Sequence, residues 1–282
     1  MRILKNSFAK INITLRVTGV RDDGYHNIYS LFSRINASEK LEIRISNKNH
    51  DTVNSEGMFI KGENVISKAL RIAREYCLDI PFLDISVHKT IPPGMGLGGG
   101  SGNAGAILDF VGAKLPLNVI SKIGADVPFF NVNCEAAIVG GIGDIIDPVQ
   151  KLHINNAIIV PKWNCITKNA YKLLDMYWGQ KGGYPLNEDG AKEELESVHS
   201  RLASDSFVGL LPNDFAPRLI EENAIYMDFF KLFGDIGAIA WGITGSGASM
   251  FVLYHENKTI SLILEKIQTY NYNKYINKVI IP

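Results

Sequence analysis

The part of this chain best equipped for chemistry is a glycine-rich segment in its N-terminal half. Six glycines occur within residues 94–102, after an alternating stretch at 83–88 typical of a strand and before residues 103–113, which are typical of a helix. Glycine adopts positive φ and lets a ligand come close to the backbone. Such a loop before a helix directs several N–H groups and the positive end of the helix dipole at one point. The segment therefore predicts a phosphate-binding loop, and hence a bound nucleotide.

Three common nucleotide-binding loops fit this segment poorly. Gly94, Gly96 and Gly99 have the spacing of a dinucleotide loop, but that loop opens its fold and is followed by an acid about 20 residues later, whereas position 119 is Val. No Lys directly follows these glycines, as a P-loop requires, and no H-R-D or D-F-G tripeptide marks a protein kinase. A flexible linker is the plainest alternative, but a linker would rarely separate a clean strand from a clean helix.

Two charged residues outside the loop are candidates for catalysis. Lys10 lies between Ala9 and Ile11 in an alternating, β-rich stretch, and Asp126 precedes Val-Pro and two phenylalanines. Each has a plainer interpretation, Lys10 as a solvent-facing strand residue and Asp126 as a turn or helix-capping aspartate.

The elements that must position these residues mix strands and helices in both halves of the chain. Strands are predicted over 3–17, 40–46, 83–88, 154–160, 237–243, 249–254 and 278–281, with a hairpin over 136–146. Helices are predicted over 64–77, 103–113, 168–177 with Thr167 as N-cap, 191–204, 217–233 and 257–269. Asp147-Pro148 interrupts the pattern, so we expect two domains, 1–150 and 151–282, of the α+β class with antiparallel sheets.

Composition restricts the function classes. Hydrophobic residues make up 46% and charged residues 21% of the chain, as in an ordinary globular enzyme. The 29 basic and 29 acidic residues cancel, which argues against a nucleic-acid-binding surface. Three cysteines without a C-x-x-C pair, and histidines without metal-ligand spacing, predict reduced thiols and no structural metal site. No apolar run approaches a membrane span and no signal peptide is visible, so we expect a cytoplasmic protein without a membrane partner.

Four segments together resemble the GHMP kinase superfamily. They are Ala9–Leu15 with Arg21–His26 downstream, the glycine loop, Gly124–Phe130, and Gly245–Ser249, in the order expected for that superfamily. Within it they are most similar to the kinases that act on 4-diphosphocytidyl-2-C-methyl-D-erythritol. The resemblance implies two α+β halves, the first like ribosomal protein S5 and the second like ferredoxin, with the active site between them. It also implies ATP with Mg²⁺, a small-molecule substrate, and a monomer or weak homodimer.

The resemblance implies catalytic roles for Lys10 and Asp126. Asp126 would lie beside the substrate hydroxyl as a general base or an electrostatic orienter. Lys10 would hold Asp126 and the transferring phosphate, and its ammonium group would keep the carboxylate ionised. The residues implied to contact the substrate are Asn12, Tyr25, His26, Thr167 and Tyr171. Tyr25 and His26 would receive the cytidine part by stacking and by hydrogen bonds to the base edge, although an aromatic pair in a turn is often a simple hydrophobic lid.

The resemblance also implies a set of nucleotide-binding residues. These are Asn64, Lys89, Pro93, Gly94, Gly96, Gly98, Gly99, Gly100, Ser101 and Asn103. Ser101 has an equal interpretation as a helix cap, and Asn64 as the N-cap of the helix that follows it. Two features depart from the pattern: Gly102 occupies a position where Ser is usual, and the segment before Gly124 is short. Both put the rigidity of the loop and its affinity for ATP in question.

Two alternatives stay open at this point. The first is another GHMP kinase acting on mevalonate, homoserine or a sugar, for which a cytidine-reading pair at Tyr25 and His26 has no purpose. The second is a non-catalytic nucleotide-binding module, for which Lys10 and Asp126 would not both be needed.

Overall fold

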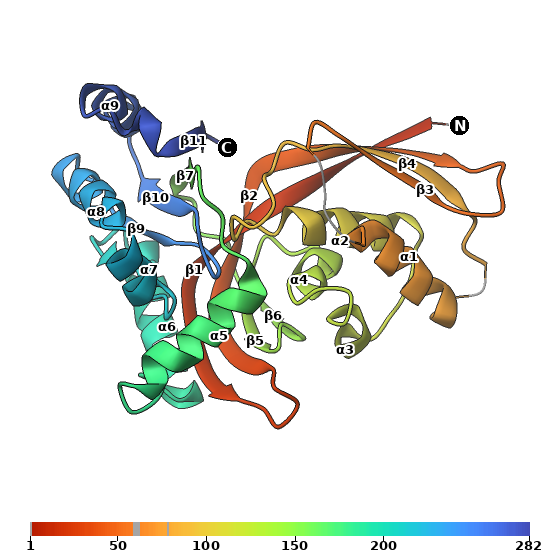
Figure 1. Cartoon of the computed structure of the whole chain (residues 1–282), viewed down its shortest axis with the longest axis horizontal. Helices are drawn as coiled ribbons and strands as arrows, with labels where there is room; N and C mark the ends of the chain where they lie inside the picture. The colour runs from red at the N-terminus through yellow and green to blue at the C-terminus, as the bar shows by residue number, and fades with distance from the viewer. Residues whose placement is uncertain (1, 59–62, 78) are drawn as a thin grey trace.

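The computed structural model describes residues 2–58, 63–77 and 79–282, whose strands form two sheets (Figure 1). The first sheet has the order β3-β4-β2-β5-β6, with β1 paired to β2, and the second has the order β11-β7-β10-β9-β8. The strands of the first are β1 (Arg2–Val20), β2 (His26–Ile45), β3 (Thr52–Glu56), β4 (Leu83–His88), β5 (Ala136–Gly141) and β6 (Ile145–Pro148). Those of the second are β7 (Asn155–Pro161), β8 (Gly209–Leu210), β9 (Ala240–Ile243), β10 (Met250–Tyr254) and β11 (Ile276–Ile280).

Nine α-helices are present in the described ranges and cover these sheets. They are α1 (Val65–Tyr76), α2 (Gly99–Phe110), α3 (Leu117–Ile120), α4 (Val127–Val132), α5 (Thr167–Gly179), α6 (Glu188–Ala203), α7 (Ala216–Glu222), α8 (Ile225–Asp235) and α9 (Asn257–Thr269). Helices α1 and α2 pack on β2 and β4 through one apolar cluster that includes Leu41, Ile85, Leu70 and Ile107. The α+β class is therefore confirmed, whereas the domain boundary near residue 150 stays a prediction.

Strand β2 organises the first sheet because its two ends have different partners. It pairs with β1 over almost its whole length, with β5 over Ile28–Ser33, and with β4 over Lys40–Ile45. The strand predicted at 40–46 corresponds only to the end of β2 that pairs with β4. The missed part carries Asn27, Ser30 and Arg34 among its apolar residues, so hydrophobic alternation did not reveal it.

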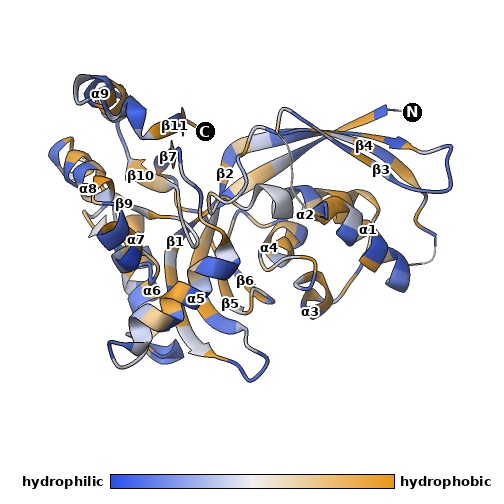
Figure 2. Ribbon diagram, viewed as in Figure 1, coloured by the Kyte–Doolittle hydropathy of each residue, from blue (hydrophilic) through white to orange (hydrophobic). Residues whose placement is uncertain are grey.

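The two sheets share buried apolar residues. Ile11 and Leu31 of the first sheet lie in one cluster with Ile158 and Phe251 of the second. Strand β10 is buried at every position and is largely hydrophobic in Figure 2. The residues of β1 and β2 that belong to this core thus tie the first sheet to the second.

Several predicted boundaries are corrected by the structure. The strand at 3–17 extends to Val20, and the helix predicted over 217–233 is two helices separated at Asn223-Ala224. The helix predicted over 103–113 begins at Gly99, because tertiary packing overrides the low helix propensity of its glycines. Thr167 is the first helical residue of α5 and not its N-cap, which is Ile166. The strand at 83–88 and the helix at 257–269 are confirmed.

Gly102, the departure noted in the glycine loop, has a packing reason. A Cβ atom at this position would lie 2.2 Å from the carbonyl oxygen of Phe8 in β1. The missing side chain therefore lets α2 lie directly against the strand that carries Lys10.

No helix among the described residues is both long and apolar enough to cross a membrane.

Candidate active site

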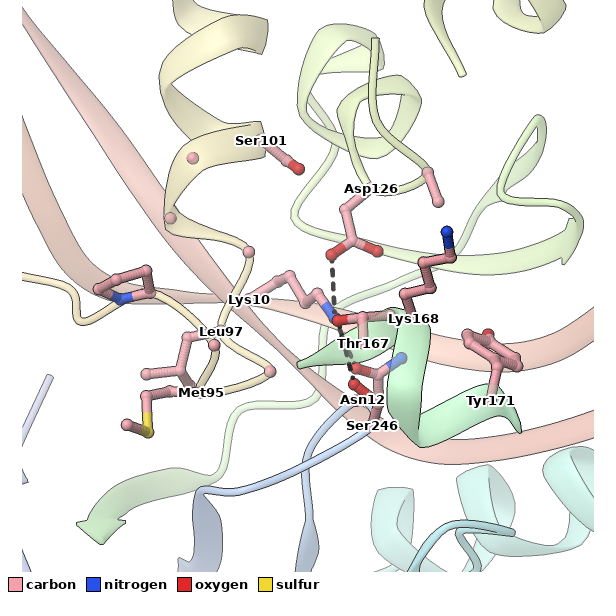
Figure 3. A pocket seen from close by; sticks show the side chains of 18 of the residues that line it. Lys10, Asn12, Met95, Leu97, Ser101, Asp126, Thr167, Lys168, Tyr171 and Ser246 are labelled. Carbon is pink, nitrogen blue, oxygen red and sulfur yellow. Dashed lines mark hydrogen bonds and ion pairs between the residues drawn. The ribbon is translucent and has the colours of Figure 1, made fainter. Parts of the chain in front are cut away.

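A cleft of about 1070 Å³ lies where the glycine loop, β1, α5 and the loop before α4 meet (Figure 3). Single small-molecule pockets have volumes of roughly 300–1,000 Å³, so this cleft has room for two ligands side by side. Every residue that the sequence assigned to the site lines it: Lys10, Asn12, Tyr25, His26, Asn64, Lys89, Pro93, Gly94, Gly96, Gly98, Gly99, Gly100, Ser101, Asn103, Asp126, Thr167 and Tyr171. Their placement together is observed, and their roles in binding and catalysis stay predictions.

The glycine loop ends in an unblocked helix N-terminus. Gly98 is the N-cap of α2, has φ of 67° and has no side chain to cap the helix. The first backbone bond of the helix runs from the Gly102 N–H to the Gly98 carbonyl, at 2.8 Å. The N–H groups of Gly99, Gly100 and Ser101 precede it and, like the first N–H groups of any helix, have no intrahelical acceptor. Because these residues line the cleft, their N–H groups form an anion-binding end there.

Ser101 is not the cap of this helix, so that alternative is wrong. Its side chain points toward Asp126 across the cleft in Figure 3. Asn64, by contrast, is the N-cap of α1, since its Oδ1 accepts a hydrogen bond from the Ile66 N–H at 2.9 Å. That alternative is confirmed, and the predicted contact between Asn64 and adenine stays a prediction.

Lys10 and Asp126 form an ion pair, with 3.3 Å between Lys10 Nζ and Asp126 Oδ2. The Lys10 side chain is 3% exposed and lies 4.6 Å above the Phe32 ring centroid, while the Asp126 side chain is 28% exposed. Asp126 stands at the N-cap position of α4, yet its side chain makes no capping bond. Its carboxylate therefore faces Lys10 and the cleft, which argues against the capping interpretation. Burial lowers the pKa of Lys10, and the carboxylate of Asp126 opposes that shift.

Asn12 is bound mainly to the protein itself. Its Oδ1 accepts a hydrogen bond from Lys10 Nζ at 2.6 Å, and its Nδ2 donates to Ser30 Oγ at 2.9 Å. Its backbone N–H donates to Thr244 Oγ1 at 3.0 Å. The structure thus shows Asn12 holding the Lys10 ammonium group in place, while a direct contact with substrate stays a prediction.

Glu39, which the sequence analysis missed, is buried behind the wall of the cleft and bonds to residues that line it. Its side chain is 0% exposed and accepts hydrogen bonds from the N–H groups of Thr90, at 3.0 Å, and Ile91, at 2.7 Å. It also accepts from Asn103 Nδ2 at 2.9 Å and forms an ion pair with Lys89. The ammonium group of Lys89 is therefore directed at Glu39. A signal was present: Glu39 shares the strand face of the buried Leu41 and Ile43, where an unpaired acid would be costly.

Several aromatic side chains lie at the other end of the cleft. Tyr25 is 61% exposed at the turn between β1 and β2, and the neighbouring His26 ring lies 4.5 Å from the Tyr171 ring. His26 Nε2 is 2.7 Å from Asp175 Oδ1, and the Tyr184 hydroxyl group donates to the same carboxylate. Burial raises the pKa of Tyr171, so it keeps its proton. The sequence analysis missed Asp175, although it follows Tyr171 by one helical turn on α5.

Thr167 connects α5 to the loop after β9. Its Oγ1 lies 3.3 Å from Ser246 Oγ, and both residues line the cleft. Thr244 belongs to this loop after β9, and Gly96 of the glycine loop faces it. A Cβ atom on Gly96 would lie 2.0 Å from the Thr244 carbonyl oxygen. The glycine loop therefore fits closely against this loop, as well as against β1.

Comparisons with known proteins identify relatives of this chain. Residues 64–146 match the model of the GHMP kinases N terminal domain. The chain is 32% identical over 259 residues to the 4-diphosphocytidyl-2-C-methyl-D-erythritol kinase of Thermotoga maritima, covering 89% of this chain and 92% of that protein. It is 31% identical to the protein of the same name from Porphyromonas gingivalis, covering 88% and 90%.

Solved structures show the same fold. A crystal structure of 4-(cytidine 5'-diphospho)-2C-methyl-D-erythritol kinase has a TM-score of 0.74 at 22% identity, covering 95% of this chain and 96% of that one. A homoserine kinase from Cytophaga hutchinsonii has a TM-score of 0.67 at 18% identity, covering 99% and 94%. At these identities the likeness concerns the fold, which is the two-part α+β arrangement predicted from the sequence.

Proposed function

This chain belongs to the 4-diphosphocytidyl-2-C-methyl-D-erythritol kinase family of the GHMP kinases, and from that premise we propose that it phosphorylates the 2-hydroxyl group of its substrate. The chain is an ATP-dependent kinase of isoprenoid synthesis. The products would be the 2-phosphate of 4-diphosphocytidyl-2-C-methyl-D-erythritol and ADP. The observation that carries this proposal is the ion pair of Lys10 and Asp126 at the wall of the cleft, facing the N-terminus of α2.

The glycine loop would hold the β- and γ-phosphates. Gly99, Gly100 and Ser101 line the cleft, and their N–H groups, without intrahelical acceptors, carry the positive end of the α2 dipole. Positioning and electrostatic stabilisation account for most of the catalysis in phosphoryl transfer, because little covalent chemistry is left to the protein. A preformed helix N-terminus supplies both without reorganisation.

Lys10 and Asp126 would act on the reacting groups. The Asp126 carboxylate would accept the proton of the attacking hydroxyl group or orient that group toward the γ-phosphoryl group. Lys10 would stabilise the charge on the transferring phosphoryl group, and Asn12 would keep the ammonium group at that position through its 2.6 Å hydrogen bond. Proton transfer to a positioned side chain, as proposed for Asp126, contributes roughly 10²–10⁴-fold to the rate.

Ser101 and Asp126 are the residues that would hold Mg²⁺, together with the nucleotide phosphates. No cluster of three or more His, Cys, Asp and Glu side chains in the described part of the chain could hold a metal ion by itself. Mg²⁺ binds hard oxygen ligands and is usually held by one or two carboxylates together with substrate phosphates. The Asp126 carboxylate and the Ser101 hydroxyl group that points toward it fit this requirement. Bound there, the ion would neutralise charge on the phosphates.

The aromatic end of the cleft would take the cytidine part. Tyr25 offers an exposed ring for stacking, and His26 is oriented by Asp175. Thr167 and Tyr171 on α5 would close over the substrate, while Asn64, Lys89 and Asn103 would lie on the nucleotide side. We also retain the expectations of two domains divided near residue 150, a cytoplasmic monomer or weak homodimer, and no nucleic-acid or membrane partner.

The test is ADP release by the purified protein with Mg-ATP. We compare 4-diphosphocytidyl-2-C-methyl-D-erythritol with mevalonate, homoserine and galactose, and we expect release only with the first. Release with another substrate would keep the kinase chemistry and remove the cytidine assignment of Tyr25 and His26. Binding of ATP without release for any of them would favour a non-catalytic nucleotide-binding module.

A further inference from the structure

The charged side chains that line the cleft differ in whether they already have a partner. They are Lys10, Asp23, Lys89, Asp126, Lys168, Lys172 and Asp175. The pairs are Lys10 with Asp126, Lys89 with Glu39, and Asp23 with Arg21, while Asp175 binds His26 and Tyr184. Within the described ranges, only Lys168 and Lys172 among these have no ion pair or side-chain hydrogen bond. The cleft therefore presents two uncompensated positive charges, both on α5.

These two lysines lie on the face of α5 that is turned to the cleft. Positions 168, 171, 172 and 175 follow the three- and four-residue spacing of one helix face, and all four line the cleft. Ala170 and Leu174 are buried on the opposite face. In Figure 3 the side chain of Lys168 leaves α5 on the side where Asp126 lies. Lys172 follows one turn later, about 6 Å along the axis, on the way to Asp175 and His26.

We propose that Lys168 and Lys172 bind the diphosphate group of a cytidine-diphosphate-linked alcohol, Lys168 the phosphate next to the alcohol and Lys172 the phosphate next to the cytidine. The inference rests on the proposed function, since it divides that substrate among parts of the cleft. Asp126 lies on the side of α5 from which Lys168 extends, and Lys172 and then Asp175, with its partner His26, follow along the helix. That order matches the substrate, in which the diphosphate lies between the reacting alcohol and the base.

The charge balance of the cleft supports this assignment. A diphosphate loses solvation when it enters a cleft and needs opposite charge or hydrogen-bond donors in return. The nucleotide phosphates have the N-terminus of α2, whereas the Lys10 ammonium group is already bound to Asn12 and Asp126. An ammonium–phosphate hydrogen bond is charge-assisted and stronger than a neutral one. The two lysines of α5 are thus the donors left for a second pair of phosphates.

Calorimetric titration with cytidine and with cytidine 5'-diphosphate tests the proposal without requiring turnover. The variants are Lys168→Met, Lys172→Met and the double variant, in which Met keeps the apolar stem. Lys181→Met is the matched control: it removes one positive charge just beyond α5, where the ammonium group lies over the Tyr177 ring and outside the cleft. The KM values for ATP and for the alcohol substrate are measured in parallel.

The expected result is a loss of affinity that only the diphosphate ligand reports. Each single variant should bind cytidine 5'-diphosphate roughly tenfold more weakly and cytidine unchanged, as expected for one charge-assisted hydrogen bond. The double variant should lose the preference of the wild-type protein for the diphosphate, and Lys181→Met should keep it. The KM for ATP should not change.

Two outcomes would overturn the proposal while leaving the proposed function intact. One is a double variant that retains the full preference for cytidine 5'-diphosphate. The other is a rise in the KM for ATP without a rise in the KM for the alcohol substrate, which would assign the lysines to the nucleotide. A third outcome is different: a wild-type protein that binds neither cytidine nor its diphosphate would remove both the lysine assignment and the cytidine site.

Discussion

The two walls of the cleft are built differently. The glycine-loop wall is braced, in the sense that a buried side chain behind it holds it by hydrogen bonds. Glu39 is fully buried and joins β2 to Thr90, Ile91 and Asn103. The α5 wall has only Ala170 and Leu174 buried among its helical residues, and Thr167, Lys168 and Lys172 are exposed. A loop that holds phosphates must be preorganised to stabilise charge, whereas the α5 wall, proposed to receive the alcohol substrate, presents its side chains to the cleft.

The largest effect is expected where the two walls meet, at Asp126. Asp126→Asn removes the negative charge and the proton acceptor while leaving the glycine loop untouched. We expect kcat to fall by roughly 10²–10⁴-fold. ATP added without Mg²⁺ should still bind with nearly its original affinity, because the N-terminus of α2 is unchanged. A coupled ADP assay measures the first quantity and calorimetry with ATP the second.

The matched control for Asp126→Asn is Asp175→Asn, which neutralises a carboxylate in the same cleft away from the phosphate loop. Near-normal turnover of Asp126→Asn would remove Asp126 from the chemistry. Equal losses in both variants would show that the net charge of the cleft, and not the position of one carboxylate, sets the rate.

The next effect should be confined to the nucleotide wall, at Glu39. Glu39→Gln leaves the buried Lys89 without its counter-ion, and breaking a buried ion pair costs about 3–5 kcal/mol when one partner is lost. The double variant Glu39→Gln/Lys89→Met should recover part of that stability. In both variants the KM for ATP should rise while the KM for the alcohol substrate stays within about twofold, because residues 89–91 lead into the glycine loop.

Chemical denaturation measures the stability of the Glu39 variants, and initial rates give the two KM values. An equal rise in both KM values would show that Glu39 supports the whole cleft. Unchanged stability would mean that the ion pair is not retained in solution. Either result would weaken the contrast between a braced nucleotide wall and an exposed α5 wall.

The sequence predicted the two walls unequally for physical reasons. The glycine loop could be predicted from the local sequence alone, because six glycines between a strand and a helix indicate a loop whose backbone approaches a ligand. Lys10 and Asp126 became a pair only through the family resemblance, since 116 positions of sequence separate them and only the fold brings them to 3.3 Å. Asp175 was missed because an acid on an exposed helix is ordinarily solvated.

Part of the fold was likewise hidden from local patterns. The first half of β2 lacks regular alternation, and one of its polar residues, Ser30, is buried where it accepts a hydrogen bond from Asn12. Helix α2 begins four residues before its predicted start, at Gly99, because its glycines lie against β1 and α4. In these two places the sequence rules failed because of a contact with a candidate site residue or because of unusually close packing.

A smaller effect is expected at Tyr25, on the substrate side. Tyr25→Ala removes an exposed ring whose stacking on a base is worth roughly 1–3 kcal/mol. The KM for the alcohol substrate should therefore rise about tenfold, and the KM for ATP should not change. Tyr25→Phe is the control and should behave like the wild-type protein if stacking dominates. Initial rates at varied concentrations of each substrate separate the effects, and equal changes in both KM values would place Tyr25 outside a cytidine site.

The smallest effects are expected at Asp175, whose proposed role is to orient His26, and at its partner Tyr184. The Asp175 carboxylate is 44% exposed, so an ion pair with a protonated imidazole would stabilise the fold by less than about 1 kcal/mol. Asp175→Asn should leave the stability almost unchanged and raise the KM for the alcohol substrate by about threefold, because His26 loses the carboxylate that orients it. Tyr184→Phe removes the other donor to Asp175 and should have a still smaller effect. A KM change in Tyr184→Phe as large as that in Asp175→Asn would show that the three side chains act as one unit. The α5 wall would then be braced as the glycine-loop wall is, and the difference between the two walls would be one of exposure alone.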